Sequence, residues 1–350
     1  MERSTNDILL DYIDRAAFCV RGGVIVQANH AAQQKGIYPE TPVSAFLGEN
    51  ESVYADFRGG SLYLTLLIYQ LPCGASVTRT EDMDIFLLDE DIATSLQVLA
   101  LSAQHLRTPL QNAFSIAELL QQDRRYSKTG WELSKGLHQL HRIICNMADT
   151  YRYNELTDVT LVSSDLTCLF SEMMEKCSAF VEKAGFSLEY HGLYETVIGM
   201  AAPELLERAI YNLISNAARF SRSGSTVTAA LTKNENQLVF CVRNETADDL
   251  AEGNLWQRYR REPGIEDPRH GLGLGMVLVS AAASVHGGTV LVDHPNANET
   301  RVTMTIPIVK ENGSNLRTPV LRISDYAGGR DKGLLELAEI LPSNAYNDIN

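Results

Sequence analysis

The chain has 350 residues, of which 45% are hydrophobic and 21% charged, and its formal net charge is −14. This length predicts two or three domains, and the composition excludes wholesale disorder and collagen-like repeats. Because a protein that coats nucleic acid needs a basic surface, the acidic balance disfavours nucleic-acid binding, and it also disfavours attachment to an anionic membrane.

Targeting and cysteine patterns point to the cell interior. No apolar run reaches 18 residues, and the N-terminus lacks a basic segment followed by an apolar one, so we expect no membrane span and a cytoplasmic protein. The six cysteines are scattered without a CxxC pair. This pattern predicts reduced thiols rather than a zinc site or a disulfide framework.

Residues 1–88 have the pattern of a small α+β module. A short helix is expected around Asp7–Ala16, and Gly22-Gly23 interrupts the apolar run Ala17–Val26, which is typical of a β-hairpin. Further stretches rich in β-branched, aromatic and leucine residues are Ser61–Gln70, Ala75–Arg79 and Met83–Leu88. Together they predict a mostly antiparallel sheet with few helices.

Residues 89–157 carry the clearest periodicity of the chain. Apolar residues recur in steps of four and three from Ile92 to Leu120 and again from Leu133 to Tyr151, so each stretch predicts a helix with a heptad seam. A polar loop joins the two helices into an antiparallel hairpin. Because a lone hairpin buries little apolar surface, we expect two chains to pair into a four-helix bundle. His138 and His141, on the second helix, are expected at the surface.

Residues 158–309 read as an α/β domain, followed by a less regular tail over 310–350. Helices are expected at Asp165–Ala184, Pro203–Phe220 and Gly273–His286. Strands are expected at Ser187–His191, Thr226–Thr232, Gln237–Asn244, Thr289–Asp293 and Arg301–Pro307, in a mixed sheet with helices on one face. The tail has a possible strand at Val320–Ile323 and a possible helix at Lys332–Ile340.

Two segments of the α/β domain suit a nucleotide triphosphate. Gly271, Gly273 and Gly275 alternate just before a predicted helix, whose free N–H groups favour a phosphate; the spacing is neither that of a dinucleotide fold nor of a Walker A loop. Asn212 and Asn216 lie four residues apart on one helix face near Arg219. Amide oxygens there suit magnesium and the guanidinium suits phosphate, although a solvated polar face explains that pattern equally well.

A third segment, Gln104–Leu110, lies inside the first heptad helix. The register places His105 on the outer face, and Pro109 removes a helix hydrogen bond and favours a kink. An exposed histidine beside a kink can accept a phosphoryl group; the alternative is a merely solvated side chain.

The order of these segments resembles the sensor histidine kinases over residues 90–307. Leu106–Leu110 matches the core of their phosphoacceptor box, and Asn212–Ser221 matches their asparagine box. Leu255–Arg261 is similar to their aromatic box, and Gly271–Leu274, continuing to His286–Val290, matches their second glycine box. Val24–Ala32 resembles part of a PAS sensor module.

The resemblance implies an α+β multidomain chain. Its parts are a PAS-like module (1–88), a dimerising hairpin (89–157), an α/β sandwich of the gyrase and Hsp90 type (158–309) and a tail of unassigned role (310–350). The implied ligands are ATP and Mg²⁺, and the implied partners are a second copy of the chain and a response regulator.

The resemblance also implies roles for single residues. His105 is the candidate phosphoacceptor, in one box with Arg107 and Pro109. Asn216 ligands magnesium, with Asn212 and Arg219 near the phosphates. The residues of the nucleotide lid are Gly271, Leu272, Gly273 and Leu274.

Two departures from the family pattern leave the activity open. Gln104 stands where the family has its phosphoacceptor histidine, and His105 stands where it has an acidic residue. Asn244 stands where the family has the aspartate that accepts from the adenine amino group, without the glycines that follow it there. The chain is therefore expected to be a histidine kinase that uses a displaced His105. The alternative is a catalytically impaired pseudokinase that acts as an ATP-binding regulator, a phosphatase or a dimeric scaffold.

Overall fold

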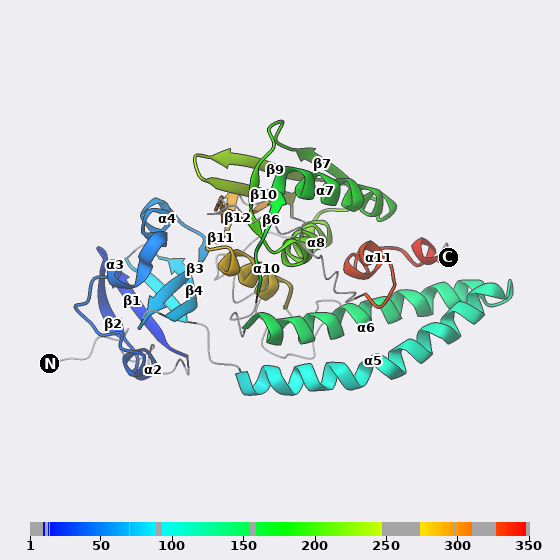
Figure 1. Ribbon diagram of the computed structural model, residues 1–350, viewed down its shortest axis with the longest axis horizontal. Coiled ribbons are helices and arrows are strands. Elements are labelled where there is room, and N and C mark those ends of the chain that lie inside the picture. Colours follow the sequence, from blue (N-terminus) through cyan, green and yellow to red (C-terminus); the bar gives the residue numbers. More distant parts are fainter. Residues whose placement is uncertain are drawn as a thin grey trace.

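The computed structural model describes residues 10, 13, 15–69, 71–80, 82–88, 93–154, 159–246, 274–296, 298–309 and 327–347. Most of the helix expected around Asp7–Ala16, and the strand expected at Val320–Ile323, lie outside these residues. Within them, the chain is mixed α and β (Figure 1), as the sequence predicts. No helix in this part of the chain combines the length and apolar character needed to cross a membrane.

The N-terminal module is an antiparallel sheet with short helices on its longest connection. The strands are β1 (Ala17–Arg21), β2 (Val24–Ala28), β3 (Ser61–Ile68), β4 (Leu71–Arg79) and β5 (Asp84–Leu88), in the order β2-β1-β5-β4-β3. The helices α2 (His30–Gln34), α3 (Ser44–Leu47) and α4 (Glu51–Asp56), with the 3₁₀ turn Gly48–Asn50, connect β2 to β3. Gly22 and Gly23 form the expected hairpin turn at positive φ, which glycine adopts without steric cost.

Two long helices form the expected hairpin. They are α5 (Ala93–Gln122) and α6 (Ser127–Asn154), and Pro109 lies inside α5. Their shared core contains Ala103, Leu110, Phe114, Ala117, Leu137 and Ile144. The seam residues Leu106 and Leu140 remain 43% and 44% exposed, so this hairpin leaves apolar surface uncovered along the faces that the bundle prediction requires.

The α/β domain places three helices on one face of a mixed sheet (Figure 1). The helices are α7 (Leu166–Lys183), α8 (Pro203–Phe220) and α10 (Leu274–Val285). The strands are β7 (Ser187–His191), β9 (Thr226–Asn234), β10 (Gln237–Glu245), β11 (Val290–Asn296) and β12 (Glu299–Pro307), and β7 pairs with β9 in parallel while the other pairs are antiparallel. Two further strands, β6 (Val162–Asp165) and β8 (Ile198–Ala201), form a separate ribbon.

One sheet runs through both the N-terminal module and the α/β domain. Strand β3 pairs with β11 in antiparallel fashion, which joins the two into a ten-stranded sheet. At the junction Gly60 has a φ of +86°, and a Cβ there would lie 2.7 Å from the carbonyl oxygen of Val292. The hydroxyl of Thr65 also hydrogen-bonds Ser284 on α10 at 3.1 Å. The sequence gives no sign of this pairing, because it depends on two edge strands more than 200 residues apart.

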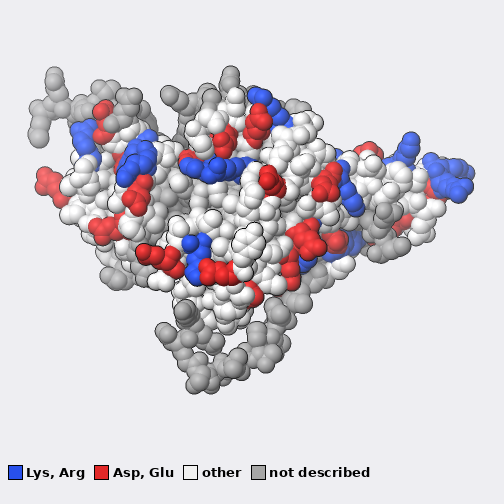
Figure 2. All heavy atoms as spheres, turned by 90° about the horizontal axis from the view of Figure 1, so that it is seen from above, with Lys and Arg blue, Asp and Glu red and all other residues white. Residues whose placement is uncertain are grey.

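The C-terminal segment, residues 327–347, packs against α6, α7 and α8 (Figure 1). It contains α11 (Lys332–Glu336) and a 3₁₀ turn at Ser343–Tyr346. The helix expected over Lys332–Ile340 is therefore shorter than predicted, although Asp331 caps its start by accepting from the backbone N–H of Leu334 at 3.0 Å. Charged side chains of both signs are interspersed over the face of the molecule in Figure 2.

Candidate functional site

Helix α8 carries three of the predicted nucleotide-binding residues. Its start and end match the prediction, because Pro203 fixes the first turn and an apolar face packs on the sheet. Along this helix Asn212 is fully buried, Asn216 is half-buried and Arg219 is 19% exposed at its side chain. The three side chains therefore lie in different environments and not on one solvated face.

Asn212 is hydrogen-bonded within the protein. Its Nδ2 donates to the carbonyl oxygen of Arg208 at 2.8 Å, and its Oδ1 accepts from Arg142 of α6 at 3.1 Å. Gly275 of α10 packs so closely that a Cβ would lie 2.7 Å from this Oδ1. In this arrangement Asn212 links α6, α8 and α10, whereas the sequence predicts that it faces phosphates.

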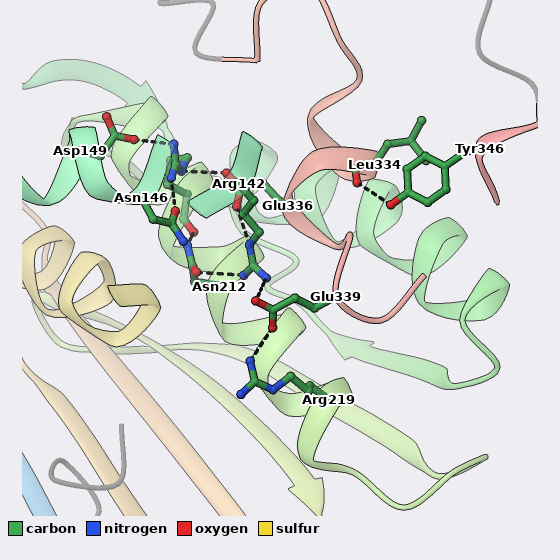
Figure 3. A network of polar contacts seen from close by, with 10 residues as sticks. Arg142, Asn146, Asp149, Asn212, Arg219, Leu334, Glu336, Glu339 and Tyr346 are labelled. Atoms are coloured by element: carbon green, nitrogen blue, oxygen red, sulfur yellow. Dashed lines mark hydrogen bonds and ion pairs between the residues drawn. The ribbon is translucent and has the colours of Figure 1, made fainter. Parts of the chain in front are cut away.

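Around Asn212, two buried guanidinium groups face three carboxylates of the chain (Figure 3). Arg142 lies 3.5 Å from Glu336 and 3.2 Å from Glu339, while its side chain is 4% exposed. Arg208, 1% exposed, lies 2.8 Å from Glu336 and also pairs with Asp149. Such a pairing is needed because an unpaired buried charge is strongly destabilising.

Arg219 is held by the same network. Its guanidinium pairs with Glu339 of the C-terminal segment and stacks over the ring of Phe220 at 4.7 Å. Glu339 thus bridges Arg142 and Arg219 (Figure 3). Arg219 is predicted to neutralise phosphate, and in this structure its partner is a carboxylate of the same chain.

Asn216 and Asn244 are the predicted ligand contacts that keep polar atoms available. The side chain of Asn216 has no hydrogen bond to any residue that the structure describes. Asn244, near the end of β10, is 6% exposed, and its buried Nδ2 has no partner in the part of the chain that the structure describes. A bridge between Ser221 and Thr246 places the end of β10 beside the end of α8. An orphaned buried donor is costly unless something pairs with it. The Nδ2 of Asn244 therefore suits an acceptor such as a ring nitrogen of the base, and the amide oxygen of Asn216 suits magnesium.

The predicted lid lies outside the described residues. This applies to Gly271, Leu272 and Gly273, and to the segment Leu255–Arg261. Leu274 begins α10. The structure therefore does not test the roles predicted for these residues.

The candidate acceptor box is exposed on α5. His105, Arg107 and Pro109 all have exposed side chains. The hairpin turns α6, not α5, toward the α/β domain, since α6 packs against α10 and α11 (Figure 1). His105 is thus open to solvent, as predicted, but belongs to the helix farther from α8.

The prediction that His138 and His141 are surface residues is wrong. They are 1% and 2% exposed. The ring of Tyr346 lies 4.7 Å from that of His138, and the ring of Phe114 lies 4.9 Å from it. Burial lowers the pKa of each histidine to about 4, and the positive charge of Arg330 acts in the same direction. The error arises because the covering residue comes from the far end of the chain.

The sequence interpretation missed Arg142, Arg208, Glu336 and Glu339. A weak signal was present in the spacing of Glu336 and Glu339, which places both carboxylates on one side of a short helix and its continuation. Nothing local connects them to Arg142 or Arg208. Their partnership is a property of the tertiary structure.

Comparisons with known proteins agree with this architecture. The family model of histidine kinase-, DNA gyrase B- and HSP90-like ATPases matches residues 201–310. A bacteriophytochrome of Pseudomonas aeruginosa is 26% identical over 203 residues, which cover 56% of this chain and 28% of that protein. The sensor histidine kinase CusS of Escherichia coli is 25% identical over 258 residues, which cover 65% of this chain and 53% of that protein.

A solved structure shares the fold. The crystal structure of full-length ShkA in complex with AMPPNP aligns with a TM-score of 0.50 and 18% sequence identity, over 62% of this chain and 47% of that one. The present chain thus spans about a quarter to a half of the length of these two curated relatives.

The sheet, α8 and α10 together define an ATPase domain of the class that histidine kinases share with gyrase and HSP90. The hairpin precedes this domain, and the matches to the two curated relatives extend beyond it: over this part the chain is similar to sensor histidine kinases.

Proposed function

We propose that the chain binds Mg-ATP beside α8 and the end of β10 and acts in histidine-based phosphoryl transfer. The observation that carries this proposal is that, among the described residues, neither Asn216 of α8 nor the buried Nδ2 of Asn244 of β10 has a hydrogen-bond partner, while the Ser221–Thr246 bridge joins the ends of these two elements. Asn216 would hold magnesium, Arg219 would contact phosphate, and Asn244 would meet the adenine edge. Bound magnesium would neutralise the charge of the triphosphate.

The proposed acceptor is His105 on α5, and the proposed onward acceptor is an aspartate of a response regulator. An exposed acceptor suits a reaction whose catalysis is mostly positioning and charge neutralisation. We also propose that two chains pair through the exposed seam residues of α5 and α6. The N-terminal module (1–88) then serves as a PAS-like sensor, and the protein acts in the cytoplasm.

A second candidate is a pseudokinase that binds ATP without phosphorylating itself. Two observations favour it. Gln104 stands at the position of the family's acceptor histidine. In addition, Arg142 of α6 engages Asn212, a residue predicted to serve the phosphates.

Labelling with γ-labelled ATP and magnesium separates the two candidates. A kinase gives alkali-stable, acid-labile label that disappears in His105→Ala and persists in His191→Ala, a matched change of an exposed histidine on β7. No label in the wild-type protein, together with measurable ATP binding, refutes the kinase and supports the pseudokinase.

Nucleotide binding itself is tested at Asn216. Asn216→Ala should abolish magnesium-dependent ATP binding, because no other predicted ligand replaces its amide oxygen. Asn234→Ala, at the exposed end of β9, is the control. Equal ATP affinity in both variants would show that the nucleotide site lies elsewhere.

A further inference from the structure

The C-terminal segment is built into the hairpin by specific contacts. The guanidinium of Arg330 lies 3.7 Å above the ring of Phe114 on α5. The ring of Tyr346 lies against His138 on α6, and Gln139 of α6 donates to the carbonyl oxygen of Ala338 at 3.2 Å. These contacts cover the buried face of the hairpin that carries His138 and His141.

The same segment also contacts helices α7 and α8 of the ATPase domain. Lys332 pairs with Glu207 of α8 at 2.6 Å. Gly333 packs so tightly on Phe180 of α7 that a side chain there has no room. Glu339 pairs with Arg219, near the C-terminal end of α8.

We infer that the C-terminal segment is an internal competitor of the nucleotide: it docks between the hairpin and the ATPase domain and takes the cationic group that the phosphates need. The inference rests on the proposed function, because it concerns the same Arg219. The segment thus occupies an interface lined by Arg142, Arg208 and Arg219, where its own carboxylates, Glu336 and Glu339, pair with these arginines.

Competition follows from charge and from geometry. Glu339 takes the Nη1 donor of Arg219, so a phosphate that binds through this nitrogen competes with the carboxylate. A carboxylate beside Arg219 also repels a triphosphate in a partly buried site. Moreover, Glu336 and Glu339 hold Arg142, and Arg142 holds the Oδ1 of Asn212. Release of the segment therefore frees Arg219 and loosens the contact that engages Asn212.

Linkage makes the effect reciprocal. If the docked segment lowers the affinity for nucleotide, then nucleotide must lower the affinity of the segment for its interface by the same factor. The apparent dissociation constant is raised by the inverse of the fraction of molecules with the segment released. Weakening the segment at any of its contacts should therefore tighten nucleotide binding, even at a contact remote from Arg219.

The test uses two variants of the full chain and AMPPNP with excess Mg²⁺ in calorimetric titrations. Glu339→Gln removes the charge beside Arg219, and Arg330→Ala weakens the segment at α5, away from the nucleotide site. Both should bind AMPPNP at least about fivefold more tightly than the wild type. Glu189→Gln, an exposed glutamate on β7, should leave the affinity unchanged. In hydrogen exchange, AMPPNP should accelerate exchange of the wild-type amides of 333–341.

The outcomes separate this inference from the proposed function. If only Glu339→Gln binds AMPPNP more tightly, the effect is local charge repulsion at Arg219. That result would overturn the inference that nucleotide displaces the segment. Equal affinities in all proteins would overturn the inference while the proposed function stands. If no variant and not the wild type binds AMPPNP, while the amides of 333–341 exchange faster in Arg330→Ala, both the proposed function and the competition are refuted. The segment then has a structural role only.

Discussion

Glu336→Gln tests whether the buried ionic network holds the C-terminal segment in place. Glu336 is fully buried and faces two guanidinium groups, Arg142 and Arg208. The substitution keeps the volume but leaves three arginines to share two carboxylates. Removing one member of a buried pair costs about 3–5 kcal/mol, which corresponds to a hundredfold or greater rise in the population with the segment detached. Hydrogen exchange of the amides of α8 and α11 measures that population directly.

The matched control is Glu195→Gln, which removes a carboxylate from an exposed pair with Lys233. An exposed pair of this kind contributes less than about 1 kcal/mol. Arg142→Met combined with Glu336→Gln should recover part of the loss, because it restores the charge balance. Exchange rates in Glu336→Gln that match those of the control would refute the reasoning, since they would mean that water already screens the network.

Three further predictions concern pH, the sheet junction and the dimer. Burial lowers the pKa of His138 from 6.5 to about 4, so between these pH values the unfolded chain binds a proton that the folded chain excludes. The free energy of unfolding should therefore keep its full value above pH 6.5 and fall by up to about 3 kcal/mol toward pH 4. Urea titrations at several pH values would detect this fall. Gly60→Ala should lower the free energy of unfolding by about 2–3 kcal/mol, because residue 60 has a positive φ and the new Cβ would clash with the backbone of β11. Gly59→Ala is the control, because a Cβ there meets open space. Equal hydrogen exchange of the β3 and β11 amides in the two variants would contradict this prediction. Leu106→Glu or Leu140→Glu should yield monomers by light scattering, and dimers in both variants would count against the four-helix bundle.

Local signals were sufficient for most elements. Helix α8 follows from Pro203 at its first turn and an apolar face with helical period, and β7 follows from a short run of β-forming residues. The heptad pattern predicted the hairpin, because each seam repeats over several turns. Asn216 was predicted as a ligand from the asparagine box, and Asn244 from its place at the position of the family's aspartate; both roles stay predictions.

Contacts between distant segments could not be read in this way. His138 was predicted at the surface because it lies outside the apolar seam of α6. In the fold, Tyr346 covers it from more than 200 positions away. The tail helix was overextended because Leu337 and Ala338 continue the apolar pattern, although they are buried in a turn.

The sequence by itself determined the elements, their order and the residue types suited to magnesium and phosphate, because periodicity, capping and motif spacing act over a few residues. Only the tertiary structure decided which partners these residues meet. In the folded chain β3 pairs with β11, Arg142 donates a hydrogen bond to Asn212, and Glu339 forms an ion pair with Arg219. Edge-strand pairing and buried charge balance are set by surfaces that meet only in the folded chain. For that reason the sequence predicted Arg219 as a phosphate ligand, and the fold gave it a carboxylate.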